Sequence, residues 1–133
     1  MQVTVMKTAL RATNAAPARR SNCVIANTLD RVGDKWSLLL VRDMLAGKST
    51  YGQFLESPEG IPTNILADRL KRLEQYGIVA RSVYQERPVR HAYSLTPMGK
   101  QLGRVLRAMA DWALENIPGT KKEIVPGSFK GDS

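Results

Sequence analysis

The stretch that decides the fold is "GIPTNILADRLKRLEQYGIVARSVYQERPVRHAYSLT", residues 60–96. Its first half predicts a helix that starts near Pro62, because proline suits the first turn of a helix, and that ends at Gly77. Apolar residues recur there at helical spacing, which predicts one buried face and one polar outer face. The inward positions are Ile65, Leu66, Leu70 and Leu73, and the outward positions are Thr63, Asn64, Ala67, Asp68, Lys71 and Arg72.

The second half of this stretch predicts a β-hairpin. The runs "IVARSVY" (78–84) and "HAYSLT" (91–96) are rich in β-branched and aromatic residues, as strands are. A tight hairpin needs only a turn of Gly or Asn, yet the loop here carries Arg87, Pro88 and Arg90. Arginine is suited to bidentate contact with phosphate, and proline would stiffen the loop. The loop is therefore predicted to meet a negatively charged partner.

Three helices are expected upstream of this stretch. The first covers about residues 22–32 and stops at Gly33; the second, "KWSLLLVRDML", is capped by Asp34 and ends at Gly47. A short third helix over about 50–57 leads into a "SPEG" turn. The first helix is predicted to carry Ile25, Leu29 and Val32 on one face, and the third to have a narrow apolar edge of Tyr51, Phe54 and Leu55. The predicted buried side of the second consists of Trp36, Leu39, Leu40 and Met44.

The order of these elements predicts a winged helix-turn-helix fold: mainly α with a small β-hairpin (α+β), and with extra N- and C-terminal helices for dimerisation. A short helix, a turn and a second helix with a polar edge form a helix-turn-helix, and a two-stranded hairpin follows. In a winged helix the second helix enters the major groove of DNA. The hairpin tip reaches a neighbouring phosphate or the minor groove, which would account for the arginines at the tip.

The charge distribution agrees with a polyanionic partner. The 133-residue chain carries a net charge of +8, and the 68–107 stretch alone contributes nine basic residues against three acids. Such a face attracts nucleic acid most often and an acidic membrane surface sometimes. The alternative is the ordinary solvated surface of a basic protein.

The length and composition indicate one soluble domain flanked by two tails. No apolar run approaches the ~20 residues that span a bilayer, so no membrane partner is expected, and the location is predicted to be the bacterial cytoplasm, at the nucleoid. Residues 1–20 are interpreted as a flexible basic tail, with a transit peptide or a DNA-touching arm as alternatives. Residues 21–117 are assigned to the domain, and 118–133 to an irregular tail.

The final predicted helix, "TPMGKQLGRVLRAMADWALENI" (96–117), carries a seam of apolar residues spaced three and four apart. The seam consists of Leu102, Val105, Met109 and Trp112. It either covers the domain's own core or pairs with a second copy of the chain. A large Trp and a Met suit an interface, and readers of DNA often use two-fold symmetry, so a homodimer is favoured.

The sequence contains no pattern that indicates an enzyme, a cofactor or a metal site. One Cys and one His cannot form a three- or four-ligand site, and no nucleophile elbow or glycine-rich phosphate loop occurs. His91 is interpreted as a surface or DNA-proximal residue. Trp36 and Tyr76 are interpreted as core residues rather than as the lining of an effector pocket, and no small-molecule effector is indicated.

Cys23 has two interpretations. A cysteine near the start of a helix is often a small, inert packing residue. With Arg19 and Arg20 close by, its thiol pKa would instead be lowered, which would make it a redox sensor. The chain has no second cysteine, so any disulfide would join another subunit or a small thiol.

Taken together, these segments resemble the HxlR-type family of bacterial winged-helix transcription regulators. The resemblance covers about 23–112 and rests on Cys23, "VGDKWSLLLVRDML", "GKSTYGQF", "GIPTNILADRLKRLEQYGIV", "RSVYQERPVRHAYSLTPMGKQL" and Trp112. It implies a homodimer on inverted-repeat operator DNA, with the first and last helices at the dimer contact and an oxidant-sensing cysteine in some members. Thr50 and Tyr51 stand where the family usually has Arg-Phe, and Pro62 stands where Ser or Ala is common.

The resulting hypothesis is a homodimeric, sequence-specific regulator that binds double-stranded DNA. The alternatives are an RNA- or ribosome-associated winged domain and a protein-interaction module. The predicted DNA-binding residues are Lys35, Thr50, Thr63, Asn64, Ala67, Asp68, Arg69, Lys71, Arg72, Arg87, Arg90 and His91. The predicted dimer contacts are Ile25, Leu29, Leu102, Val105, Met109 and Trp112.

Overall fold

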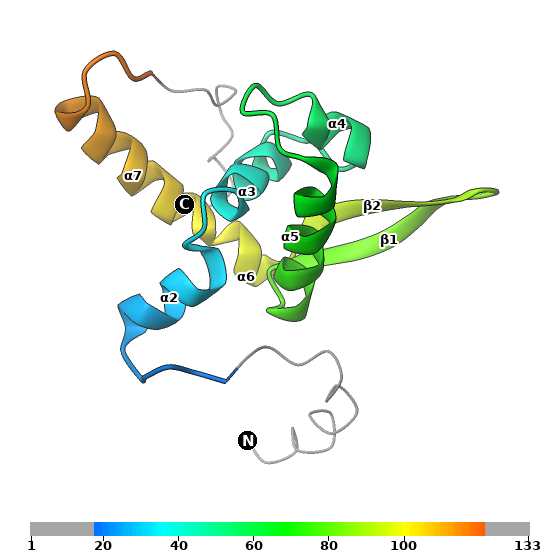
Figure 1. Cartoon of the computed structure of the whole chain (residues 1–133), viewed down its shortest axis with the longest axis horizontal. Coiled ribbons are helices and arrows are strands. Elements are labelled where there is room, and N and C mark those ends of the chain that lie inside the picture. Colours follow the sequence, from blue (N-terminus) through cyan, green and yellow to red (C-terminus); the bar gives the residue numbers. More distant parts are fainter. Residues whose placement is uncertain (1–17, 122–133) are drawn as a thin grey trace.

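Helices surround a small core and a two-stranded hairpin extends away from them in the computed structural model, which describes residues 18–121 (Figure 1). Most of the two predicted tails lies outside these residues. The predicted mainly helical fold with a single hairpin is confirmed. In chain order the elements are α2 (Val24–Val32), α3 (Ser37–Leu45), α4 (Tyr51–Leu55), α5 (Thr63–Gln75), β1 (Val79–Glu86), β2 (Val89–Leu95), α6 (Pro97–Lys100) and α7 (Leu102–Asn116).

The core lies between α3, α5 and the base of the hairpin. Phe54 of α4 and Leu66 of α5 are fully buried there, together with Val41 of α3. Leu55, by contrast, is exposed, so the predicted apolar edge of α4 narrows to Tyr51 and Phe54. Leu70 and Leu73 continue the buried face of α5, and Ile65 packs at its margin. The predicted inward face of this helix is thus confirmed.

Two helix ends fix how α4 and α5 join the rest of the chain. At the start of α4, Thr50 and Gln53 form a reciprocal capping box, in which each side chain accepts a hydrogen bond from the other residue's backbone N–H. At the end of α5, Gly77 adopts a left-handed φ of 79°. The Gly77 and Ile78 N–H groups then bond to Glu74 and Leu73 carbonyls, a Schellman ending that turns the chain into β1.

The hairpin is longer and tighter than predicted. β1 and β2 pair antiparallel out to Glu86 opposite Val89, so the turn consists of Arg87 and Pro88 alone. Arg90 pairs with Gln85 within the ladder, and the prediction that Arg90 lies in the tip loop is therefore wrong. Both strands of the hairpin extend beyond the β-branched segments from which they were predicted, because cross-strand pairing also accommodates polar residues.

The predicted single helix over 96–117 is also wrong, because the structure has two helices that meet at Gln101. The Thr96 hydroxyl caps the first turn of α6 by accepting from the Gly99 N–H. Gly99 lies against the Ile78 carbonyl, where a Cβ would clash. α6 is thereby held at the base of the hairpin, while α7 packs along α3.

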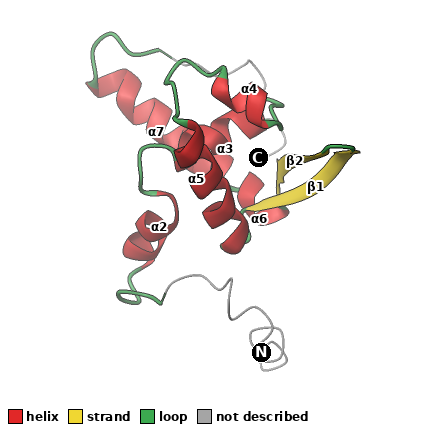
Figure 2. Cartoon of the chain, turned by 45° about the vertical axis from the view of Figure 1, so that its right-hand side comes forward, coloured by secondary structure: helices red, strands yellow, loops and turns green. Residues whose placement is uncertain are grey.

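The hairpin and the two outer helices occupy opposite sides of the molecule. Figures 1 and 2 show the hairpin projecting to one side, while α2 and α7 lie on the other. Among residues 18–121, every helix is too short or too polar to cross a lipid bilayer.

Candidate nucleic-acid interface

The outer face of α5 is exposed along its length. Thr63 and Asn64 in its first turn, and Ala67, Asp68 and Lys71 further along, are all open to solvent. Pro62 is the N-cap residue and provides no side-chain cap, so the first N–H groups of the helix are left without a side-chain partner. Side chains in the first turn of a recognition helix are those best placed to reach base edges.

A groove runs between α5 and the hairpin. It consists of two adjoining hollows of about 570 and 620 Å³, which share Tyr51, Arg81 and Tyr93. Lys71 and Ala67 line its α5 side, and the lining on the hairpin side includes Arg90 and His91, with Thr50 at the start of α4. Lys71, Arg81 and Arg90 therefore face one continuous surface next to the outer face of α5, and Glu74, 3.8 Å from Arg81, is the acid among the described lining residues.

Sequence reasoning missed the place of Arg81 and Tyr51 in this groove. Arg81 is directly opposite Tyr93 in the hairpin register, so both lie on one face of the sheet. Strand alternation alone could not reveal this, because it is the register of the hairpin that places Arg81 beside the buried Tyr93. The ring of Tyr51 lies 6.0 Å from that of Tyr93, which places an aromatic side chain on the floor of the groove.

Three predicted DNA-binding residues point elsewhere. The Arg69 guanidinium donates to Asp34 at 2.9 Å and also bonds to Asp68. Arg72 donates to the Asp30 carbonyl. Lys35 places its ammonium 5.1 Å from the centre of the Trp36 ring, at the start of α3.

The arginine at the hairpin tip is free of such internal partners. Arg87 is exposed in the turn, and within residues 18–121 no side-chain bond engages its guanidinium. Together with Arg90, it places positive charge on the outer part of the hairpin.

A buried ionic network holds the turn that precedes α5. Arg42 of α3 forms a bidentate pair with Glu59, with both N–O distances at 2.9 Å, and also bonds to Asp43. The second Asp43 oxygen accepts from the Ser57 hydroxyl, which in turn accepts from Lys48. The hydrogen bonds between Arg42 and Glu59 hold the pKa of the Glu59 carboxyl below its usual value and raise the pKa of the Arg42 guanidinium.

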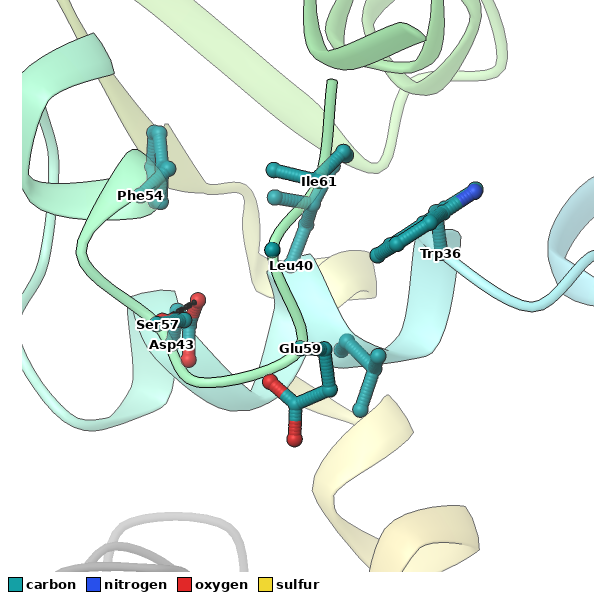
Figure 3. A pocket seen from close by; sticks show the side chains of 9 residues that line it. Trp36, Leu40, Asp43, Phe54, Ser57, Glu59 and Ile61 are labelled. Atoms are coloured by element: carbon teal, nitrogen blue, oxygen red, sulfur yellow. Dashed lines mark hydrogen bonds between the residues drawn. The ribbon is translucent and has the colours of Figure 1, made fainter. Parts of the chain in front are cut away.

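Figure 3 shows the space beneath this turn, with Asp43 and Ser57 joined on one side and Trp36, Leu40 and Ile61 on the other. The hollow measures about 10 Å³, which is room for one water molecule at most. The turn therefore rests on a filled core, so that the start of α5 is held against α3 by packing as well as by charge.

A second anchor lies just before α3, whose N-cap residue is Trp36 rather than the predicted Asp34. Asp34 accepts from the backbone N–H groups of Trp36 and Ser37 and from the Ser37 hydroxyl, in addition to Arg69. Burial opposes ionisation of Asp34, but these bonds outweigh it and lower the pKa of its carboxyl. Asp34 thus joins the first turn of α3 to the middle of α5.

Cys23 is exposed and is the N-cap residue of α2. Of the two arginines expected near it, Arg20 is instead paired, at 2.6 Å, with Asp30, a residue of α2. The thiol is accessible, therefore, but the charge of Arg20 is directed towards a carboxylate.

Comparison with known proteins agrees with this architecture. The model of the HxlR-like helix-turn-helix family matches residues 31–121. An uncharacterized HTH-type transcriptional regulator of Synechocystis is 39% identical over 111 residues, covering 79% of this chain and 82% of that protein.

Two solved structures of regulators share the fold. The redox regulator HypR, in its oxidized form, superposes with a TM-score of 0.64 at 35% identity, over 71% of this chain and 97% of HypR. The reduced transcriptional regulator YodB of B. subtilis superposes with a TM-score of 0.62 at 30% identity, over 76% of this chain and all of YodB. The chain belongs to the HxlR-like helix-turn-helix family, and it is a DNA-binding transcriptional regulator of the winged type.

Proposed function

We propose that the protein acts as a homodimer on an inverted-repeat operator, with α5 in the major groove and the hairpin on the flanking backbone. The observation that carries this proposal is the exposed outer face of α5 beside a groove that presents Lys71, Arg81 and Arg90. Polar residues in the first turn of α5 would contact base edges, while the basic side chains would contact phosphates.

The test is selection of bound sequences from random duplex DNA, followed by titration at several salt concentrations. A two-fold symmetric motif is expected, with an affinity that falls steeply as salt rises, because each neutralised phosphate releases counterions. Preference for duplex RNA would favour the RNA-associated alternative, and binding to neither would favour a protein-interaction module. Affinity that stays flat between low and moderate salt would contradict the proposed interface.

The proposed dimer contact lies on α2 and α7, on the side of the molecule away from the hairpin (Figure 2). Ile25, Leu29, Met109 and Trp112 are large apolar side chains that are all exposed in the single chain. Val105 is half-buried and Leu102 packs against the core, so the inner end of the predicted seam belongs to the domain itself. A second copy would cover the outer end of the seam and α2, and would set the spacing of the two α5 helices.

Replacement of Trp112 by Asp tests this contact, because it would bury an unpaired charge there. Sedimentation is expected to show monomers for this variant. Val89→Asp is a matched control, since Val89 is as exposed (60% against 62%) but lies on the hairpin, and it should remain dimeric. If both variants stayed dimeric, the interface would lie elsewhere.

A signal-sensing role for Cys23 is a second proposal, supported by its exposure at the N-cap of α2. Diamide would accept two electrons and two protons from a pair of thiols, which would become a disulfide between two subunits or with a small thiol. Because α2 is part of the proposed dimer contact, that bond would shift the two α5 helices relative to one another. Operator binding by wild type and Cys23→Ser should then diverge after diamide, and an equal response of both proteins would show that Cys23 does not carry the signal.

A further inference from the structure

A basic hollow lies between α2 and α5, apart from the groove that faces the hairpin. It measures about 250 Å³ and is lined by Arg19, Arg20, Arg31 and Arg72, with Asp30, Tyr76 and Ala18. Tyr76, predicted to be a core residue, packs against the core but is only half-buried, and it also lines the hollow. We infer that this hollow is a binding site for a small free anion that carries a carboxylate or phosphate group.

The charges around the hollow are unbalanced. Four guanidinium groups line it, and Asp30 is the one acid among the described lining residues. Asp30 is already paired with Arg20, at 2.6 Å. The positive charge of Arg19, Arg31 and Arg72 is therefore not offset by a carboxylate in the hollow, and an anion would supply the missing charge.

The arginines also hold unused hydrogen-bond donors. A guanidinium presents five N–H donors in a fixed fork that matches carboxylate and phosphate oxygens. Arg72 uses one nitrogen, on the Asp30 carbonyl at 3.4 Å, and Arg31 uses one nitrogen, on the carbonyl and side-chain oxygens of Asn27. Within residues 18–121 the remaining donors of both groups have no protein acceptor, while each guanidinium is partly withdrawn from solvent.

The walls hold these donors in place. Arg31 stacks over the ring of Tyr76 at 4.7 Å, and its bond to the Asn27 carbonyl one helical turn back fixes it on α2. Tyr76 is the C-cap residue of α5, so the site joins the first part of the domain to the end of the recognition helix. Pre-positioned donors bind an anion with less loss of side-chain entropy than flexible ones do.

The size of the hollow selects a small ligand. Pockets for drug-sized molecules usually measure about 300–1,000 Å³, so 250 Å³ suits inorganic phosphate or a compact organic acid rather than a nucleotide. The site also lies on a different flank of α5 from the DNA-facing groove. Lys71 lines that groove, whereas its neighbour Arg72 lines this hollow.

An anion here would act on both helices that matter for operator recognition. It would draw Arg31 of α2 and Arg72 of α5 towards one charge, and so fix the angle between the two helices. This regulatory consequence rests on the proposed function, because only there is α2 a dimer contact. The anion site itself does not depend on it, and it is tested on the protein without DNA.

The experiment is calorimetric titration of the full chain with inorganic phosphate and with benzoate, at constant ionic strength set by chloride. Saturable binding of at least one probe is expected, with a rise in Tm that equal chloride does not give. Arg72→Gln and Arg31→Gln should each weaken it about tenfold or more, because each removes a charge-assisted hydrogen bond. Lys71→Gln is the matched control, since it removes the same charge one residue away and should bind as wild type does.

Three results would overturn the inference. The first is that neither probe binds better than chloride. The second is an equal loss in Lys71→Gln and Arg72→Gln, which would indicate a diffuse effect of net charge. The third is that Arg31→Gln and Arg72→Gln weaken duplex binding in phosphate-free buffer as much as Lys71→Gln does, because the arginines would then hold DNA phosphates. Circular dichroism of each variant shows that a loss does not come from unfolding.

Discussion

The turn that precedes α5 and the hairpin that follows it are built in opposite ways, although both flank the same recognition helix. The turn is held to α3 by buried charges: Arg42 is 9% and Asp43 is 5% exposed, and both join bonds that reach Ser57 and Glu59. The hairpin carries its charges outside: Arg87 and Arg90 are exposed, and among residues 18–121 no buried ionic network lies beneath its outer half.

This difference indicates a division of work along the interface. A side chain that distinguishes bases must be held in a defined position, and the start of α5 has a packed core and an ionic clamp behind it. A side chain that contacts phosphates needs charge and reach more than position. The hairpin is attached at its base, where the Tyr93 N–H bonds to the Ser49 carbonyl at 2.8 Å and Thr96 bonds to Ile78. In the proposed complex, its tip would follow the DNA backbone.

The largest expected effect follows from disrupting the buried ionic network around Arg42. Arg42→Met removes one partner of a buried network and leaves Asp43 and Glu59 without their cation, which should cost about 3–5 kcal/mol of stability. Urea unfolding measures this loss. Arg87→Met is the control on the hairpin tip, where the same change should stay within about 0.5 kcal/mol. Equal effects of the two substitutions would show that the turn is no more firmly held than the hairpin.

The contrast between the two regions also explains what the sequence could and could not reveal. The helical spacing of Leu66, Leu70 and Leu73 predicted a buried face, because each position depends only on its own helix. The burial of Arg42 and Asp43 could not be predicted in this way. These residues continue an apolar run, and their burial depends on Glu59, 17 positions along the chain from Arg42.

The same limit applies to the candidate interface. An outward position on α5 shows only that the side chain lies on the face of the helix opposite the buried one. It does not show that Arg69 meets Asp34 on a different element, or that Arg72 turns towards α2. Conversely, Arg81 belongs to the groove because the ladder places it opposite Tyr93, and that register became known only with the structure.

The second prediction tests the base-contacting half of the comparison. Asn64 is exposed in the first turn of α5, and an asparagine there can bond to a base edge. Asn64→Ala should cost about 1–3 kcal/mol on the selected operator and little on random duplex DNA. Equilibrium binding to both DNAs measures the two losses. An equal loss on both would mean that Asn64 contacts the backbone rather than a base.

The third prediction tests the hairpin. Arg87→Ala and Arg90→Ala should weaken binding to operator and random DNA alike, because a phosphate contact carries no sequence information. Each should also lower the slope of log affinity against log salt by about one per subunit. If Arg90→Ala instead changed only the preferred sequence, the hairpin would be contacting bases, and the proposed division between the two regions would fail.

The smallest expected effect concerns pH and compares Asp34, which joins the start of α3 to α5, with a carboxylate on the hairpin. The pKa of Asp34 is lowered by its bonds to Ser37, Trp36 and Arg69, against the opposing effect of burial. A lowered folded-state pKa stabilises the protein above the unfolded value of about 3.9, and this contribution is lost as the pH falls through the folded value. Asp34→Asn keeps an oxygen for the helix cap but loses the charge. Its stability deficit, about 1 kcal/mol or less at neutral pH, should therefore shrink to nothing in acid.

The matched variant is Glu86→Gln at the outer end of β1, where the carboxylate is exposed and, within residues 18–121, has no bonded side-chain partner. With no cation held against it, its charge has little to stabilise in the folded state, so the variant should unfold at the same urea concentration as wild type from neutral pH down to about 3. Parallel urea titrations at each pH give both differences. A deficit in Asp34→Asn that persisted in acid would assign the loss to cap geometry rather than to charge. A pH-dependent deficit in Glu86→Gln would place a structural ion pair at the outer end of the hairpin, beyond the contact between Arg81 and Glu74, and the charges at the tip would then not be reserved for DNA.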